Sequence, residues 1–307
     1  MENRGLDVKK NRLGKQKVDK YGYAFGWPLM LVMVLLLLYP IIQITIMSFQ
    51  SWYLLRPQKN GVFIGWNNFN KLFQDKYFWS SVRKTAVYML VTIPVRYILG
   101  FVTAILLNRD YRGRAIYRAM VIIPWAVPEV VTCLIWMLMY QKDYGIINKI
   151  LLDLGWISSG VGWISDTNVA MTSAIIVNIW KGFPFVALML LAGMQSIPED
   201  VYEAAKMDGA SSFKIVTNIV IPLLRPVSAV VFMLLVVWTI RDYGIVYVLT
   251  GGGPSRATEV LTIYMYKKAF SDFNYGIAAA SGFIMMIVAF VFVYFYMKAQ
   301  KNGGMEL

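Results

Sequence analysis

Six apolar runs constrain the fold of this chain more than any other feature. Each run is close to the roughly 20 residues that a helix needs to cross about 30 Å of hydrocarbon. The backbone of a membrane segment must be hydrogen-bonded internally, and these runs do not alternate as barrel strands do. They therefore predict an all-α, polytopic membrane protein with six transmembrane helices in one domain, 27–298. The predicted spans are 27–48, 84–107, 117–140, 169–194, 226–249 and 277–298.

The composition argues against an enzyme. Of the 307 residues, 58% are hydrophobic and 15% are charged, which fits a membrane protein. The chain has no histidine, and its single cysteine, Cys133, lies in an apolar run. It also has no Walker-type phosphate loop and no G-x-S-x-G nucleophile elbow. We therefore expect no catalytic residue, no metal site and no cofactor.

The basic residues predict the orientation. If both termini are cytoplasmic, segments 1–26, 108–118, 195–225 and 298–307 lie inside and hold 16 Lys and Arg. The outside segments are longer in total and hold 11. The positive-inside rule therefore predicts an N-in/C-in protein. Its parts are a basic cytoplasmic arm, 1–26, a cytoplasmic loop between helices 4 and 5, 195–225, and a cytoplasmic tail, 299–307. This distribution of the net charge of +13 argues against a nucleic-acid partner.

The polar stretch 196–226 carries strong helix punctuation. Ser196 and Glu199 have the S-x-x-E spacing of a capping box, with Pro198 in the first turn. Gly209 has the position of a left-handed residue that ends a helix. The stretch therefore predicts two short helices joined at Gly209. The expected cap and end of the second helix are Ser211 or Ser212 and Pro222.

This stretch resembles a known signature. The order Glu203-Ala204-Ala205, then Gly209, then Ile221-Pro222 resembles the "EAA" motif of the permease subunits of bacterial ABC importers. Asp208-Gly209-Ala210 and Ile197-Pro198 resemble the maltose-type, carbohydrate-uptake branch. The alternative is an ordinary interfacial hairpin. The resemblance implies a coupling loop that contacts the ATPase through Glu203, Ala204, Ala205, Asp208, Gly209, Ile221 and Pro222.

The resemblance also implies partners and a location. In such importers two permeases form the path, two ABC ATPase subunits bind the ATP, and an extracytoplasmic sugar-binding protein delivers the cargo. We therefore expect a multi-pass protein of the bacterial plasma membrane with a second, homologous permease as partner. Further likenesses to this branch are the segments Leu249-Thr250-Gly251-Gly252-Gly253-Pro254 and Trp180-Lys181-x-x-Pro184-Phe185.

Five charged residues lie inside the predicted spans, where charges are expensive and are often functional. Arg96, Glu129 and Lys181 fall near the middle of their spans, and Arg241 and Asp242 lie nearer the outside. One hypothesis is that they line a path for cargo. The alternative is that they pair with one another and hold the helices together. Arg96, Glu129 and Arg241 depart from the apolar residues that are usual in the resembling branch.

Neighbouring aromatic and polar residues support the path hypothesis. Trp125, Glu129 and Trp136 fall on one stripe if 117–140 is a continuous helix, and Asn178 shares a face with Lys181. Aromatic rings offer apolar faces to sugar C–H groups, and polar side chains bind hydroxyls. The predicted path residues are Trp125, Glu129, Trp136, Asn178, Lys181, Trp238, Arg241 and Asp242.

The sequence as a whole predicts a sugar-importing permease driven by a partner ATPase. The alternative is an ion-coupled secondary transporter that acts alone, for which Glu129 and Asp242 are the carboxylates available within the spans. The three cations in the spans exceed the two carboxylates. This excess predicts an acidic oligosaccharide as cargo, unless water, a lipid phosphate or the partner permease supplies the anion.

Residues 66–79 also predict an amphipathic surface helix on the outer side.

Overall fold

The computed structural model describes residues 20–302, with side-chain exposure from residue 26 to residue 298. The chain divides into two units, residues 1–46 and residues 47–307. From the first unit, α1 (Lys20–Met33) continues through a π-helical turn, Val34–Leu38, into α2 (Tyr39–Ser48), whose last two residues belong to the second unit. Most of the predicted basic arm lies outside the described residues. The predicted tail begins inside the last helix, which runs to Asn302.

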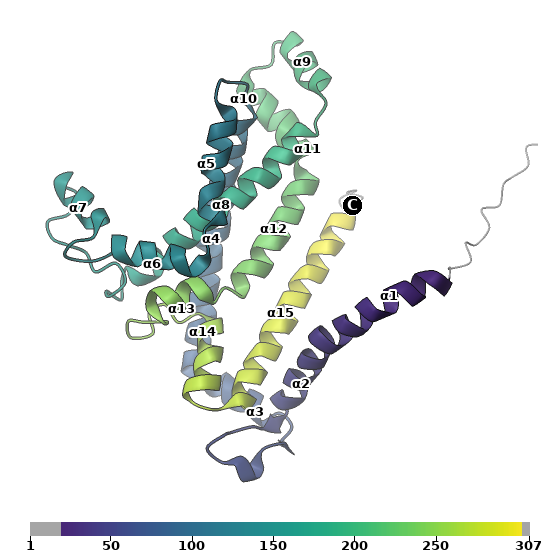
Figure 1. Ribbon diagram of the computed structural model, residues 1–307, viewed down its shortest axis with the longest axis vertical. Helices are drawn as coiled ribbons and strands as arrows, with labels where there is room; N and C mark the ends of the chain where they lie inside the picture. Colours follow the sequence, from purple (N-terminus) through teal and green to yellow (C-terminus); the bar gives the residue numbers. More distant parts are fainter. Residues whose placement is uncertain (1–19, 303–307) are drawn as a thin grey trace, which may run out of the picture. The chain divides into compact units, whose positions relative to one another are not determined.

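The second unit is almost entirely helical, as Figure 1 shows. Its two π-helical turns after Ile215 and Tyr266 are Val216–Val220 and Lys267–Ser271. In the described residues the only strands are β1 (Gln50–Ser51) and β2 (Val62–Phe63), which pair antiparallel with Gln50 opposite Phe63. The helices are α3 (Asn67–Gln74), α4 (Lys76–Asn108), α5 (Arg114–Ala126), α6 (Glu129–Met139), α7 (Ile146–Asp153), α8 (Ala170–Gln195), α9 (Glu199–Met207), α10 (Ser212–Ile215), α11 (Ile221–Leu223), α12 (Arg225–Ile240), α13 (Gly244–Thr250), α14 (Leu261–Tyr266) and α15 (Tyr275–Asn302).

The helices confirm the fold class, an all-α polytopic membrane protein. Four of them are long and apolar enough to cross a membrane: Gly26–Ser48, α4, α8 and Tyr275–Lys298 of α15. Two further pairs pass the same test but are bent, α5 with α6 by 93° and Ser212–Leu223 with α12 by 68°. If each bent pair is one span, the number of candidate spans is six.

The predicted third span, 117–140, is bent by 93° between α5 and α6 rather than forming one continuous helix. α5 ends at Ala126, Val127 is extended, and Pro128 begins α6. Proline has no backbone N–H and disfavours a helical conformation of the residue before it. The chain therefore turns sharply at this point.

The fifth span also differs from its prediction, 226–249. α12 ends at Ile240, and Arg241–Tyr243 form a link to the separate helix α13. On the other side, the helix that begins at Ser212 continues past Pro222 to Leu223, so Pro222 does not end it. Pro222 lies inside this helix, just after its π-helical turn Val216–Val220.

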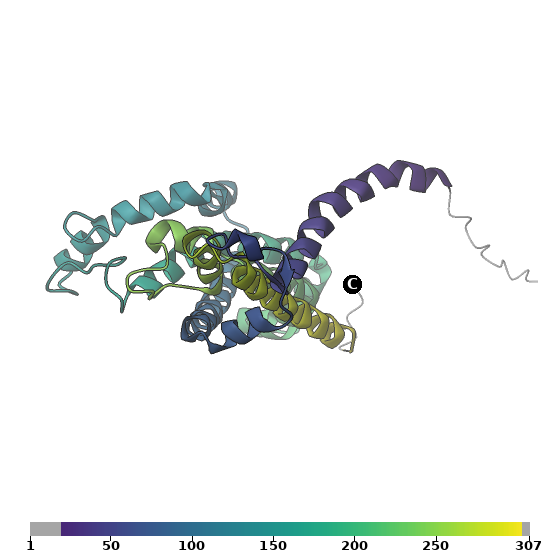
Figure 2. The ribbon, with the colours of Figure 1, turned by 90° about the horizontal axis from the view of Figure 1, so that it is seen from below.

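The core of the second unit lies along α4 and α8, which pack against each other. Gly100 of α4 lies against Val186 of α8, so the two backbones approach closely. Buried apolar side chains from α12 and from the α9–α10 region extend this core. Between membrane helices, a small residue at such a contact lets the backbones come close, and van der Waals packing then stabilises the pair. Figure 2 shows the unit from below, turned by 90° from the view of Figure 1, with α7 (teal) away from α15 (yellow).

The predicted surface helix, 66–79, is shorter in the structure. α3 ends at Gln74, and its side chains Phe69 and Leu72 are buried against α15. Asp75 then begins α4 by accepting a hydrogen bond from the Tyr77 N–H at 2.8 Å. Partial burial opposes ionisation of Asp75, but the bonds from the Tyr77 N–H and the Tyr264 hydroxyl outweigh it and lower its pKa. A cap therefore separates the surface helix from the span.

Candidate functional site

A cavity of about 360 Å³ collects polar and aromatic side chains from α4, α5, α6, α8 and α12 and from the link before α13. All the predicted path residues except Trp136 line it: Trp125, Glu129, Asn178, Lys181, Trp238, Arg241 and Asp242. Arg96 and Tyr243 line it as well. The structure thus brings together residues from sequence positions 96 to 243.

A hydrogen-bonded network crosses one wall of the cavity. Arg96 is only 7% exposed, and its Nη1 donates to Asn178 Oδ1 at 3.0 Å. Asn178 Nδ2 donates to Asp242 Oδ2, which also accepts from the Tyr88 hydroxyl at 2.7 Å. Asn178 therefore bridges the cation and the carboxylate. The network joins α4, α8 and the α12–α13 link.

The other charges have different surroundings. Lys181 Nζ donates to the Val127 carbonyl at 2.6 Å, at the break between α5 and α6. The last carbonyls of a helix lack partners within it, so a lysine is a favourable partner there. Glu129 lies against Gly244, and Arg241 is exposed.

The alternative in which the five charges form ion pairs with one another is not what the structure shows. Between residues 26 and 298, no ion pair within 4.0 Å includes Arg96, Glu129, Lys181, Arg241 or Asp242. The buried Nε of Arg96 also has no hydrogen-bond partner among the described residues. The charged groups around the cavity therefore make no direct ion pairs with one another.

Trp136 lies away from the cavity, which corrects the predicted stripe on residues 117–140. The bend at Pro128 separates Trp125, on α5, from Trp136, on α6. Trp136 packs against Trp180 with ring centroids 5.8 Å apart. Phe185 takes its place beside the cavity, between Trp125 at 6.3 Å and Trp238 at 4.7 Å.

Tyr88 is the member of the network that the sequence-based predictions did not name. Tyr88, Thr92 and Arg96 recur every four residues on one face of α4, and all three are buried. A polar stripe inside an apolar helix is a readable signal, since such residues face the interior of a helix bundle. Tyr243 carried no comparable signal, because its place depends on where α12 ends.

A second candidate site is the hairpin of α9 and α10. The Gly209 N–H donates to the Lys206 carbonyl and the Ala210 N–H to the Ala205 carbonyl, both at 3.0 Å. Gly209 has φ +74°. These are the bonds of a Schellman motif, and they confirm that a left-handed glycine ends this helix. The Ser211 hydroxyl accepts from the Lys214 N–H and caps α10, as predicted.

The capping box predicted at the start of α9 was wrong. Ser196 belongs to the end of α8, where its hydroxyl donates to the Gly193 carbonyl at 2.8 Å. Pro198 occupies the cap position of α9, and Glu199 is the first helical residue. A proline cap supplies no side-chain acceptor, and the acidic first turn, Glu199 and Asp200, complements the helix dipole there.

The hairpin has a buried side and an exposed side. Ala205 is 8% exposed and joins the core with Ile215. Met207 and Phe213 are 88% and 76% exposed, and sequence reasoning did not single them out. Of the predicted coupling residues, Glu203, Ala204, Asp208, Gly209 and Ile221 are exposed, and Pro222 is half-buried.

Each end of the second unit gathers segments that are predicted to lie on one side of the membrane. At the α9 end, a cavity of about 760 Å³ is lined by the turn 108–114 and by residues of 194–206. At the other end, the Leu54 N–H donates to the Phe273 carbonyl at 3.0 Å, and Lys84 Nζ donates to the Arg256 carbonyl at 2.6 Å. This pairing of segments agrees with the predicted topology.

Comparison with known proteins gives a family and several relatives. Residues 96–301 match the model of a family described as "binding-protein-dependent transport system inner membrane component". The trehalose/maltose transport system permease protein of Thermococcus litoralis is 36% identical over 94% of this chain and 96% of its own length. The sulfoquinovosyl glycerol transport system permease protein of Agrobacterium fabrum is 31% identical over 88% and 87%.

A solved structure shows the same fold. It belongs to a bacterial ABC transporter involved in the import of the acidic polysaccharide alginate. One of its chains matches 92% of this chain and 95% of its own length with a TM-score of 0.80 at 23% identity. The arrangement of helices described above is therefore an established one.

Proposed function

Because the chain belongs to the family of inner membrane components of binding-protein-dependent transport systems, we propose that it is a permease subunit of an ATP-driven saccharide importer. The near full-length likeness to the trehalose/maltose permease carries this proposal. A second permease would complete the path, and an extracytoplasmic binding protein would deliver the cargo. ATP would be bound by a partner ATPase.

We assign coupling to the ATPase to the α9–α10 hairpin. Met207 and Phe213 present apolar side chains on a polar hairpin, and such exposure is typical of an interaction site. Ala205 and Ile215 anchor the hairpin in the core that also includes side chains of α8 and α12. A displacement of the hairpin therefore displaces groups that pack against these helices. Movement of the ATPase can therefore change the packing of the membrane helices, provided that the hairpin contacts differ between the two states.

We assign the cargo path to the cavity around Arg96, Asn178 and Asp242. Its aromatic edge, Trp125 and Trp238, suits the C–H faces of a sugar ring. Its amide, carboxylate and cationic groups suit hydroxyls. A mixture of a few placed polar groups with aromatic walls is usual for sites that bind small polar ligands.

The test is reconstitution into liposomes with the ATPase, the second permease and the binding protein that accompany this chain. We expect uptake of labelled trehalose, maltose or an oligouronate only when ATP is enclosed on the ATPase side. The control is an ATPase subunit that cannot hydrolyse ATP. Uptake by this chain alone, driven by a proton or sodium gradient, would contradict the proposal and favour a secondary transporter.

A further inference from the structure

Five aromatic rings form a row that begins at the cavity, and we call it the aromatic ladder: Tyr243, Tyr247, Tyr266, Phe270 and Tyr275. The ring of Tyr266 lies 5.3 Å from that of Tyr243, 5.0 Å from Tyr247 and 4.9 Å from Phe270. Tyr243 and Tyr247 stack at 4.7 Å, and Phe270 contacts Tyr275 at 6.1 Å. Each ring therefore touches the next.

The ladder leads away from the α9–α10 hairpin. Tyr243 lines the cavity. The next rings belong to α13, to α14 and to the π-helical turn that follows it, and the last ring begins α15. Figure 1 shows α13 at the middle of the second unit and α14 nearer the end opposite α9. The ladder therefore connects the cavity with the end that is predicted to be extracytoplasmic.

The ladder is open to its surroundings and partly polar. Tyr247 is 39% exposed and Phe270 is 56% exposed, and the other three rings are half-buried. The hydroxyls of Tyr247 and Tyr266 lie 3.3 Å apart. Lipid tails have no hydrogen-bonding groups, so contact with lipid alone does not explain this pair of hydroxyls. Tyrosine offers both an apolar face and a polar group, which suits a ligand that has both.

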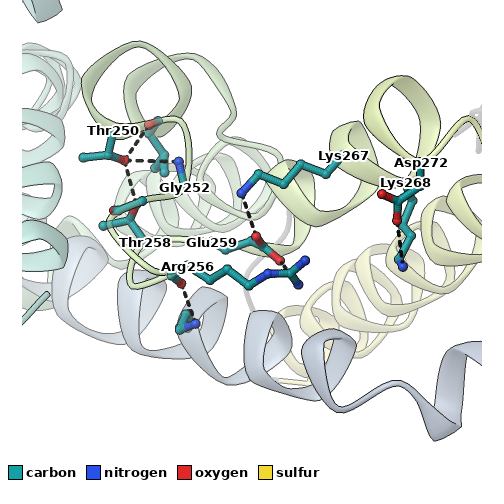
Figure 3. Close-up of polar contacts among 11 residues, drawn as sticks. Thr250, Gly252, Arg256, Thr258, Glu259, Lys267, Lys268 and Asp272 are labelled. Atoms are coloured by element: carbon teal, nitrogen blue, oxygen red, sulfur yellow. Dashed lines mark hydrogen bonds and ion pairs between the residues drawn. The ribbon is translucent and has the colours of Figure 1, made fainter.

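A polar network joins the segments next to two central rings of the ladder, and Figure 3 shows its contacts. Glu259 is 1% exposed and accepts from Lys267 Nζ at 2.8 Å and from Arg256 Nη1 at 3.1 Å. Thr250 and Thr258 share a hydrogen bond of 2.6 Å. Thr250 ends the helix that carries Tyr247, and Lys267 directly follows Tyr266. The network therefore fixes the spacing of two central rings, and a fixed spacing lowers the entropic cost of binding.

We propose that the aromatic ladder binds an extended oligosaccharide as it enters the cavity, so that the cargo is a chain of several sugar rings. This proposal rests on the proposed function and names its substrate class. The cavity, at about 360 Å³, is near the lower limit of ligand pockets, roughly 300–1,000 Å³. It has room for the leading rings of a chain. The rings behind them lie on the ladder, with C–H faces on the aromatic rings and hydroxyls at the tyrosine oxygens.

The experiment measures uptake by the reconstituted importer against chain length. The probes are two labelled series, malto-oligosaccharides and oligouronates, each from disaccharide to heptasaccharide. The variants are Tyr247→Ala and Tyr266→Ala, with Tyr247→Phe and Tyr266→Phe to keep the rings. Tyr144→Ala is the matched control, because Tyr144 is 72% exposed and lies outside the ladder and the cavity.

We expect each alanine variant to lower kcat/KM by about three- to tenfold on the longest chains, as lost aromatic contacts of this size imply, and little on the disaccharide. The phenylalanine variants keep most of the uptake. Equal loss at every length, or loss of the second permease on purification, would mean that the rings serve the membrane interface or the partner. If the unmodified importer takes up disaccharides and no longer chain, the proposal that the ladder binds an extended oligosaccharide is wrong, and the proposed function still holds. Uptake of no saccharide overturns both.

Discussion

Gly182 and Gly244 set the positions of two charged side chains in the cavity. A Cβ atom at Gly182 would overlap the guanidinium of Arg96, and one at Gly244 would overlap the carboxylate of Glu129. Gly182 lies inside α8, where glycine is less favourable than alanine by about 1 kcal/mol, and Gly244 is the first residue of α13. The missing methyl groups give the charges their space.

The substitution Gly182→Ala tests this role. The added methyl must displace Arg96, which then loses its bond to Asn178, and overpacking of this kind typically costs about 1–3 kcal/mol. We expect a lower Tm of the purified protein and reduced uptake. Gly282→Ala is the control, because its Cβ meets only the flexible end of Met265, at 3.1 Å. An unchanged or raised Tm in Gly182→Ala would count against a packed Arg96.

The two cations Lys181 and Arg241 differ in a way that sharpens the prediction of an acidic cargo. Lys181 bonds to the Val127 carbonyl, whereas Arg241 is exposed at the cavity. Arginine binds a carboxylate through two parallel hydrogen bonds. We expect Arg241→Gln to lower uptake of oligouronates by about tenfold, the loss of one charged hydrogen bond, and to spare malto-oligosaccharides.

Lys181→Met is the comparison for this prediction. This substitution removes the ammonium group that bonds to the Val127 carbonyl at the end of α5. It should therefore reduce uptake of oligouronates and of malto-oligosaccharides alike. The measurement is the ratio of uptake rates on the acidic and neutral series. A ratio that stays constant in Arg241→Gln would return Arg241 to a structural role.

Among the elements, the α9–α10 hairpin combines a rigid turn with an exposed face. Gly209 adopts a left-handed conformation that a β-branched residue resists. No side chain lies within 4 Å of the position that a Cβ would take, so the backbone conformation alone decides the effect of a substitution. The turn can therefore be altered without disturbing the core.

We expect Gly209→Val to reach the membrane but to release the ATPase or to uncouple its activity from cargo. The left-handed conformation costs a β-branched residue roughly 1–2 kcal/mol, enough to reshape the turn. The measurements are ATPase retention on purification and the stimulation of ATP hydrolysis by cargo-loaded binding protein. Gly209→Asn is the matched control, since asparagine tolerates this conformation. Normal retention and normal stimulation in the valine variant would contradict a docking role.

The bent pairs of helices show how proline shapes an element in this chain. Pro128 separates α5 from α6 by 93°, whereas Pro94 and Pro184 lie inside α4 and α8 without ending them. In α8, Pro184 is buried. At Pro128, Lys181 satisfies the carbonyl of Val127, so the break is stabilised from another helix.

At the scale of the whole molecule, we expect the two ends of the second unit to lie on opposite sides of the membrane. The turn 108–114 and the hairpin meet at one end, and the segments near Lys84 and Arg256 meet at the other. The only natural cysteine, Cys133, is buried, so it does not interfere with labelling from either side. Cysteine labelling can therefore report the topology.

We expect a cysteine at Ser212 to react with a membrane-impermeant maleimide only after the cytoplasmic side is opened. A cysteine at Ser271 should react from the outside of intact cells. Both positions are exposed, so burial does not limit either reaction. Reversed labelling would overturn the orientation and with it the coupling role of the hairpin.

The sequence by itself determined the membrane fold and the hairpin. Six apolar runs require helices in lipid, whatever else the chain does. The helix end at Gly209 depends only on the conformation of residues within one turn, so local spacing was enough to place it. The EAA order then indicated the family, because its residues lie close together in the chain.

Only the tertiary structure decided how the cavity is built. Arg96 and Asn178 are 82 residues apart, and no local rule predicts their hydrogen bond. The position of Asp242 after the end of α12 depends on Tyr88 of α4 and Asn178 of α8, which donate to its carboxylate, and on Thr262 of α14, which donates to its backbone carbonyl. Trp136 was misplaced for the same reason, because the bend at Pro128 redirects α6. Which side chains line the cavity depends on how the helices pack, and no single stretch of the sequence specifies that packing.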